Sequence, residues 1–273
     1  MRLTIDKIME LNYKEFGSGE PVIILHGLFG TLDNWQTIAK KLAAEYTVFI
    51  IDLPNHGRSP HTEGVFEYET MADALAEFLQ SHWIYETRLV GHSMGGKLAM
   101  QFALSHPDIV KKLVVVDIAP KLYVNGHQDV FEALFSIDLT TLNDRKEAEA
   151  ILMDKLKGDV GTVQFLLKNL TRNNPFNKDA NSIENTEGGN FEWKMNLKDL
   201  FDNYDSILQA PVGEPFLKPI LFIRGGNSPY IKDSDDLNTF FPNATLETIE
   251  GAGHWIHADK PKELLAALNR FLT

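Results

Sequence analysis

The 273-residue sequence contains no cysteine. Disulfide bonds, thiolate zinc sites and a cysteine nucleophile are therefore excluded. No apolar run approaches the roughly 18 residues that a membrane-spanning helix needs. The first residues, Met1 to Lys7, include charges where a signal peptide would have its apolar core. We therefore expect a cytoplasmic protein without a membrane span.

Positive charge is scarce. Against 38 aspartates and glutamates there are 26 lysines and arginines, which gives a formal net charge of −12, and no block of basic residues interrupts the sequence. Nucleic acids and anionic membrane surfaces are themselves negatively charged, so they are poor candidate partners. The expected partner is a small molecule, and the sequence leaves the oligomeric state open.

What the sequence does contain is short apolar runs that alternate with amphipathic helical patterns such as Tyr68–Phe78. This alternation predicts an α/β fold, a mostly parallel sheet with helices on both faces and right-handed crossovers. The length suits one large domain. Residues Met9–Phe16 alternate like an edge hairpin strand. The apolar runs are Pro21–Leu25, Tyr46–Ile51, Thr87–Val90, Ile109–Val116, Pro219–Arg224 and Ala244–Ile249.

Between Pro120 and Pro219 this rhythm stops, and helical patterns follow one another without a further sheet strand. An insertion of this size, between strands whose ends face one site, predicts a helical lid inserted before the last two strands. We expect a core of residues 1–119 and 213–273 and a lid of residues 120–212; a helical subdomain away from the chemistry is the alternative. The expected lid helices are Val130–Phe135, Arg145–Leu156, Val160–Leu170 and Leu197–Leu208, with loops at Asn173–Asn177 and Asn181–Asn190, and further helices are expected at Ser234–Phe241 and Lys262–Leu272.

The stretch Leu89–Gly96 contains a Gly-x-Ser-x-Gly pentapeptide centred on Ser93. A strand pattern precedes it and a helical pattern follows, which is the setting of a nucleophile elbow. Such a turn holds the serine in a strained conformation with its hydroxyl exposed. Gly91 and Gly95 are expected where strand and helix approach most closely, because the Cβ atom of a larger residue would collide with the opposing backbone there. A chance match in a loop is the alternative, and the flanking patterns argue against it.

Several segments together resemble the α/β-hydrolase superfamily over nearly the whole chain. Two details are similar to a narrower esterase group, the one that includes the bacterial esterase YbfF: Asn55 stands where many superfamily members have glycine, and His257 follows His254 as a second histidine. The segments that carry the broader resemblance are His26-Gly27-Leu28, Asp52 through Ser59, the elbow at Ser93 and Gly253-His254.

The chemistry that these residues would support is acyl transfer to water. A serine hydroxyl is a weak nucleophile until an imidazole accepts its proton, and His254 in its glycine-rich loop is the best candidate base for Ser93. His257 is the competitor, although its place at the start of the closing helix favours a capping or surface role. Three further histidines flank the site and are expected to be packed and hydrogen-bonded: His26, His56 and His92.

The acid that orients His254 departs from the commoner superfamily pattern. Ser228 occupies the usual position after the penultimate strand, and a serine cannot carry the charge that stabilises an imidazolium. Asp117 is the better candidate because it ends a fully apolar run at the same carboxyl edge of the sheet as Ser93. A carboxylate there needs a strong donor, which the ring N–H of His254 would provide. By resemblance, the esterase group also has its acid after this earlier strand.

Alternatives to Asp117 remain open. Asp117 could instead bond backbone N–H groups near Ala119 at the entrance to the lid. The downstream acids could also serve, although their position favours helix caps and partners of the helix dipole. These acids are Asp233, Asp235 and Asp236.

The oxyanion of the tetrahedral intermediate needs two preorganised donors. The backbone N–H of Met94 is one by geometry, since it follows the nucleophile, and by resemblance the backbone N–H of Leu28 is the other. Lys97 and Arg224 lie near the ends of active-site elements, where a solvated or paired charge and a substrate contact are both open. No cofactor and no metal are expected. A metal site is a weaker alternative, with the ligands His254, His257 and Asp259.

The combined expectation is a serine hydrolase that cleaves carboxylic esters, with a preference for short to medium acyl chains. One alternative is a lyase or a C–C hydrolase of the same fold, because one constellation serves many reactions. Another is a catalytically silent binding protein, although the serine, the histidine and the oxyanion loop are all intact. Aromatic residues of the expected lid would line an apolar acyl pocket or form the lid's own core: Phe131, Phe135, Phe165 and Trp193.

Overall fold

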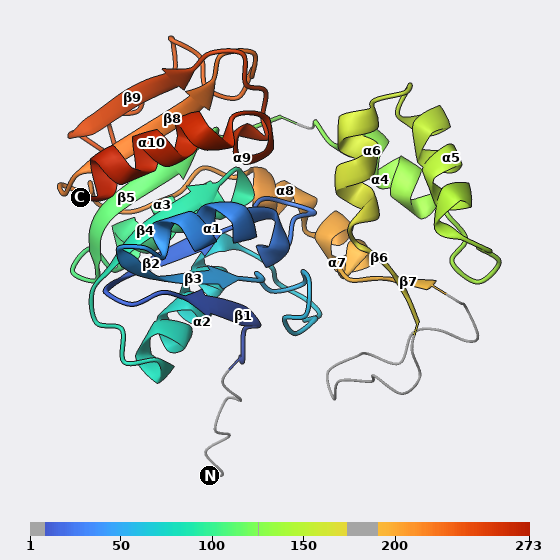
Figure 1. The fold of residues 1–273 in the computed structure, drawn as a ribbon, viewed down its shortest axis with the longest axis horizontal. Coiled ribbons are helices and arrows are strands. Elements are labelled where there is room, and N and C mark those ends of the chain that lie inside the picture. Colours follow the sequence, from blue (N-terminus) through green and yellow to red (C-terminus); the bar gives the residue numbers. More distant parts are fainter. Residues whose placement is uncertain (1–8, 125, 174–190) are drawn as a thin grey trace.

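The computed structural model describes residues 9–124, 126–173 and 191–273 (Figure 1). Its main sheet is parallel except at one edge, which confirms the predicted α/β class. Each central strand is a short apolar run buried on both faces, as expected for a parallel sheet covered by helices. The spatial order is β1 (Tyr13–Phe16), β3 (Tyr46–Ile51), β2 (Glu20–Leu25), β4 (Thr87–His92), β5 (Val110–Val116), β8 (Ile220–Gly225) and β9 (Ala244–Ile249).

Helices cover both faces of this sheet (Figure 1). On one face lie the 3₁₀ turn η1 (Leu32–Trp35), α1 (Gln36–Leu42), α9 (Ile256–Asp259) and α10 (Pro261–Leu272), which share one apolar cluster with the strands. On the other face lie α2 (Tyr68–Ser81) and α3 (Met94–Ser105), whose apolar cluster continues into the inserted segment. The sheet is thus buried on both sides, and its carboxyl edge is left for the site.

The first strand differs from the expectation. Only Tyr13–Phe16 of the predicted Met9–Phe16 is a strand, and it pairs antiparallel with β3 rather than forming a hairpin with β2. The reason is that β2 already pairs with β3 on one side and β4 on the other, so it has no free edge for β1, whereas the outer edge of β3 is free.

Most of the regular elements described between β5 and β8 are helices. This segment stands to the right of the sheet in Figure 1, apart from α8, which lies closer to the core. The expected helix at Leu197–Leu208 is divided at Asn203, and a short antiparallel pair of strands accompanies the helices, which the sequence patterns did not indicate because each strand has only three residues. The elements are α4 (Gln128–Phe135), α5 (Arg145–Lys155), α6 (Val160–Leu167), β6 (Leu170–Arg172), β7 (Phe191–Trp193), α7 (Leu197–Asp202) and α8 (Tyr204–Leu208).

The loops expected at Asn173–Asn177 and Asn181–Asn190 lie, except for Asn173, outside the described residues. The division into a core of residues 1–119 and 213–273 and a lid of residues 120–212 stays a prediction.

The prediction of a helix at Ser234–Phe241 is wrong. The segment forms turns instead. The carboxylate of Asp236 accepts hydrogen bonds from the backbone N–H groups of Asn238 and Thr239 at 2.9 and 3.1 Å. Such local bonds from aspartate offer the backbone an alternative to the helix.

Within the described ranges, none of the helices combines the length and apolar character required to cross a membrane.

Candidate active site

The elbow forms as predicted, between β4 and α3. Ser93 has φ 53° and ψ −120°, in the left-handed half of the Ramachandran plot that a serine rarely occupies. A Cβ on Gly91 would lie 2.2 Å from the carbonyl oxygen of Gly95, and one on Gly95 would lie 2.3 Å from that of His26. Such contacts are impossible, so both glycines are needed for strand and helix to meet.

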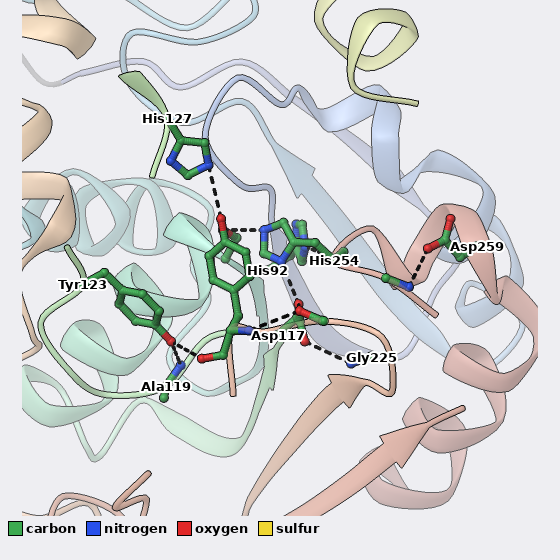
Figure 2. A network of polar contacts seen from close by, with 12 residues as sticks. His92, Asp117, Ala119, Tyr123, His127, Gly225, His254 and Asp259 are labelled. Carbon is green, nitrogen blue, oxygen red and sulfur yellow. Dashed lines mark hydrogen bonds and ion pairs between the residues drawn. The ribbon is translucent and has the colours of Figure 1, made fainter. Parts of the chain in front are cut away.

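The structure brings together Ser93, His254 and Asp117, the three residues expected to act together. His254 Nε2 lies 3.0 Å from Ser93 Oγ, and His254 Nδ1 lies 2.7 Å from Asp117 Oδ2 (Figure 2). Because a carboxylate only accepts, Nδ1–H is the donor, which leaves Nε2 free to accept the serine proton. This is the arrangement of a nucleophile, a base and an orienting acid.

Asp117 is fully buried, and sheet register explains where it lies. In the pairing of β4 with β5, His92 is opposite Val116, so the residues that follow, Ser93 and Asp117, leave the same edge side by side. Besides His254, the carboxylate accepts from Gly225 N–H at 2.9 Å and from the hydroxyl of Ser228. These donors stabilise a charge that burial would otherwise disfavour.

Ser228 occupies the position where the commoner superfamily pattern has its acid, and here its hydroxyl donates a hydrogen bond to Asp117 instead. The alternative acids are engaged elsewhere: Asp233 with Arg224, Asp235 with Lys121, and Asp236 with its own turn. The carboxylate of Asp117 does not bond the backbone of Ala119, whose N–H instead donates to the hydroxyl of Tyr123 at 2.9 Å.

The loop that contains Leu28 lies directly against the nucleophile. A Cβ built on Gly27 would be 3.1 Å from Ser93 Cβ. Two histidines hold this loop through the polar segment after β3: His26 Nε2 accepts from Leu53 N–H at 3.0 Å, and His56 Nε2 accepts from Phe29 N–H at 3.2 Å. Burial lowers the pKa of His26 to about 4 and of His56 to about 3. Both rings therefore stay neutral and can accept, which confirms the packed, hydrogen-bonded role.

The rival histidine, His257, does not reach Ser93. Its ring stacks on Trp35, with 4.9 Å between centroids, and burial lowers its pKa to about 3. Asp259 accepts from Gly253 N–H at 2.8 Å, which shapes the loop before His254 (Figure 2). In the described ranges, no three histidine, aspartate or glutamate side chains gather as a metal site would require.

Two residues at this site were not singled out from the sequence. The ring of Tyr230 stacks on His254, with 3.9 Å between centroids and 15° between planes, and its hydroxyl lies 3.2 Å from His127 Nε2. His127 Nδ1 lies 2.6 Å from the hydroxyl of Tyr204 on α8. Both residues belong to loops without a repeating pattern, so only the folded chain shows that Tyr230 lies against His254 and that His127 contacts Tyr230.

Two cavities meet at Ser93. The first, of about 350 Å³, extends from Leu28 and Met94 toward Lys97, between the core and α8. The second, of about 330 Å³, is lined by His254 and Trp255 and reaches Phe165 of the inserted segment. Ser93 is therefore accessible from two sides, as a substrate with two substituents on one ester group requires.

The aromatic residues expected around an acyl pocket are distributed differently. Phe131 is buried in the core of the inserted segment, Phe135 is largely exposed, and Trp193 packs partly against the apolar core. Phe165 alone lines one of the cavities. Arg224 is paired with Asp233, whereas Lys97 lines the first cavity.

Comparison with known proteins gives consistent matches. A family model described as alpha/beta hydrolase fold matches residues 20–261. The esterase YbfF of Escherichia coli (strain K12) is 36% identical, over 93% of this chain and 94% of its own. The sn-1-specific diacylglycerol lipase ABHD11 of Mus musculus is 36% identical, over 92% of this chain and 80% of its own. A solved marine microorganism esterase superposes with a TM-score of 0.88 at 41% identity, covering 96% of this chain and 99% of that one.

Proposed function

Because this chain belongs to the α/β-hydrolase fold family, we propose that it is a serine carboxylesterase in which Ser93, His254 and Asp117 carry out the reaction. The observation that supports these roles best is the unbroken chain of contacts from Ser93 Oγ through His254 to Asp117 Oδ2. The similarity to YbfF and to the marine esterase supports the same reaction class.

In the acylation step, Ser93 Oγ attacks the ester carbonyl carbon while His254 Nε2 accepts the hydroxyl proton. The resulting oxyanion lies between the backbone N–H groups of Leu28 and Met94. Asp117 stabilises the imidazolium without taking its proton. His254 then transfers that proton to the alcohol oxygen as the C–O bond breaks, which leaves an acyl-serine.

In the second step, water attacks the acyl-serine. His254 accepts a proton from the water and returns it to Ser93 Oγ as the carboxylic acid leaves. We assign the acyl group to the first cavity, because Met94 lines this cavity and His254 does not. The second contains the alcohol, because His254, which protonates the leaving oxygen, is in its wall.

The size of the first cavity supports a preference for short to medium acyl chains, since a volume of about 350 Å³ is at the small end for ligand pockets. The inserted segment acts as a lid over both cavities, to which it contributes Tyr204, Ile207 and Phe165. We expect a cytoplasmic location and a small-molecule ester substrate.

The test is hydrolysis of p-nitrophenyl acetate and butyrate, together with labelling by a fluorophosphonate. We expect steady turnover, one labelled residue at Ser93, and loss of both in Ser93→Ala. A same-fold lyase or C–C hydrolase would leave these esters essentially intact. A silent binding protein would not label at all, and either result would contradict the proposal.

A further inference from the structure

The first cavity is lined by a buried lysine side chain. Lys97 on α3 is only 2% exposed. Its Nζ donates to the carbonyl oxygens of Leu208 and Gln209, at 2.6 Å each, where α8 ends. Among the described residues, no ion pair includes this ammonium group. A buried charge is costly unless it is paired, so its lack of a carboxylate partner needs an explanation.

Lys97 lies one helical turn after the nucleophile. Its backbone N–H donates to the carbonyl oxygen of Ser93 at 3.0 Å. Ser93 is the N-cap residue of α3, so Lys97 lies one helical turn, roughly 5 Å, further along the helix axis. The side chain of a helical residue leans back toward the helix N-terminus, which for Lys97 is the direction of Ser93. Both line the same cavity. A short acyl chain attached at Ser93 can therefore reach the ammonium group.

The ammonium group also has donor capacity to spare. It has three N–H bonds, and two meet the carbonyl groups at the end of α8. The nearby hydroxyls are engaged within the protein, because Tyr68 donates to Ile207 O at 2.7 Å and Tyr123 to Tyr230 O at 2.6 Å. The Tyr123 ring, 4.8 Å from Nζ, offers the cation a π face but no formal charge.

We propose that Lys97 selects acyl groups that end in a carboxylate, so that monoesters of short dicarboxylic acids are the preferred substrate class. This inference rests on the proposed esterase function. The substrate carboxylate would supply the counter-ion that Lys97 lacks among the described residues, through a charge-assisted hydrogen bond in a mostly apolar cavity.

The surroundings of Lys97 support this assignment. Burial, and secondarily the like charge of Lys121, lowers the pKa of Lys97 to about 7. Lys121 is itself paired with Asp235, so it does not compete strongly for the substrate anion. The same burial that disfavours the lone ammonium group strengthens its attraction for a carboxylate that enters the cavity.

The experiment compares matched ester pairs. One series contains monoethyl esters of glutaric, adipic and pimelic acids, and the other contains ethyl pentanoate, hexanoate and heptanoate. Ethanol release gives kcat/KM at a pH below the pKa of Lys97. For at least one chain length we expect the carboxylate ester to be favoured over its neutral partner by about 10-fold or more, the scale of a hydrogen bond to a charged group.

Three variants separate direct contact from other causes. Lys97→Met should lower the ratio of carboxylate to neutral ester by roughly 10- to 100-fold, and Lys97→Arg, which keeps the charge, should retain most of it. Lys121→Met is the matched control, because it removes a nearby charge that does not line the cavity, and it should leave the ratio almost unchanged. If Lys97→Met does not fold, the wild-type ratio and competitive inhibition by adipate against hexanoate still test the idea.

A wild-type enzyme that prefers the neutral ester at every chain length would overturn the inference. So would a ratio that is the same in wild type and Lys97→Met, since Lys97 would then only anchor α8. Neutral esters and the fluorophosphonate test the esterase function by themselves. An enzyme that labels and hydrolyses neutral esters but ignores the carboxylate therefore contradicts this inference alone.

Discussion

At the scale of single residues, the feature that most distinguishes this site is Asp117, the proposed orienting acid. Asp117 has φ 55°, a conformation that aspartate tolerates better than most residues. Its backbone N–H donates to Ile223 O at 2.7 Å, which ties the turn after β5 to the neighbouring strand β8. The carboxylate is thus held by its own backbone and by Gly225 and Ser228, so it can fix the orientation of His254.

We expect Asp117→Asn to fold but to lose activity severely. An amide can donate to the imidazole, which favours the wrong tautomer of His254, and the comparable change in a serine protease triad costs about 10⁴-fold in kcat. Steady-state kinetics on p-nitrophenyl butyrate measures the loss, with Asp235→Asn as the matched control. Near wild-type activity in Asp117→Asn and inactivity in Asp235→Asn would exclude Asp117 as the acid.

The position of Ser228 predicts that the orienting carboxylate can be transferred from position 117 to position 228. Because the Ser228 hydroxyl already contacts Asp117 Oδ2, a carboxylate at position 228 would lie near the same ring nitrogen of His254. We expect Asp117→Asn with Ser228→Asp to recover at least about tenfold over Asp117→Asn alone, a small part of the triad aspartate's contribution. Ser228→Asp by itself should be less active than wild type, because two carboxylates would repel each other. No recovery in the double variant would show that only β5 can supply a working acid.

At the scale of elements, the inserted segment is tied to the core by polar side chains. Asn169 Nδ2, just after α6, donates to Phe29 O at 2.7 Å, next to the predicted oxyanion donor. Asn55 Nδ2, in the loop after β3, donates to Asp199 Oδ2 on α7 at 2.7 Å. These bonds couple the position of the helices to the geometry of the site.

Asn55 has two roles that different substitutions can separate: its backbone adopts a left-handed conformation, and its side chain bonds Asp199 on α7. Its φ of 64° suits glycine, so Asn55→Gly should keep the backbone conformation but lose the side-chain hydrogen bonds to Asp199 on α7 and to Thr62 in the same loop. We expect the free energy of unfolding to fall by about 2–3 kcal/mol and proteolysis to increase at α7. For Asn55→Ala the free energy of unfolding should fall by about a further 1–2 kcal/mol, because alanine is strained at this φ. Denaturant titration and limited proteolysis measure both, and equal stability of wild type and Asn55→Gly would rule out the anchor.

At the scale of the whole molecule, buried neutral histidines set the response to acid. Burial lowers the pKa of five of them below the ordinary value near 6.5, so between that value and their folded pKa the unfolded chain binds more protons than the folded one. The stability that these neutral histidines allow is therefore fully present above about pH 6.5 and is lost as the pH falls toward their folded pKa values. The five are His26, His56, His92, His127 and His257.

We expect cooperative acid unfolding well above pH 4. Between the unfolded and the folded pKa, each such histidine lowers the free energy of unfolding by about 1.4 kcal/mol for each pH unit. Five together lower it by about 7 kcal/mol per pH unit, which is comparable to a typical total stability of ~5–15 kcal/mol. Three carboxyl groups oppose this trend, because burial raises the pKa values of Asp52, Glu192 and Asp199, but they are fewer than the histidines. Circular dichroism against pH locates the midpoint. His257→Phe, which keeps a ring on Trp35, should move the midpoint to lower pH; an unchanged midpoint would contradict the explanation.

The local patterns of the sequence determined most of the fold. Apolar runs, helical periodicity and the glycines around Ser93 depend on neighbours a few residues away, so the strand–turn–helix of the elbow could be predicted. The same holds for His254 and Asp117 as candidates, since each follows a strand at a common edge. The false helix at Ser234–Phe241 was also a local inference, and it failed because bonds from Asp236 competed with the helix.

Only the tertiary structure decided which side chains meet. Tyr230 against His254, Asn55 against Asp199 and the ammonium group of Lys97 against the end of α8 join residues that are far apart in sequence. The order of residue types along a short stretch of sequence does not show which distant side chains will come into contact in the fold. Whether Lys97 is a solvated surface charge or a buried cation beside the nucleophile depends on how the inserted helices pack on the sheet, and that packing is a property of the whole folded chain.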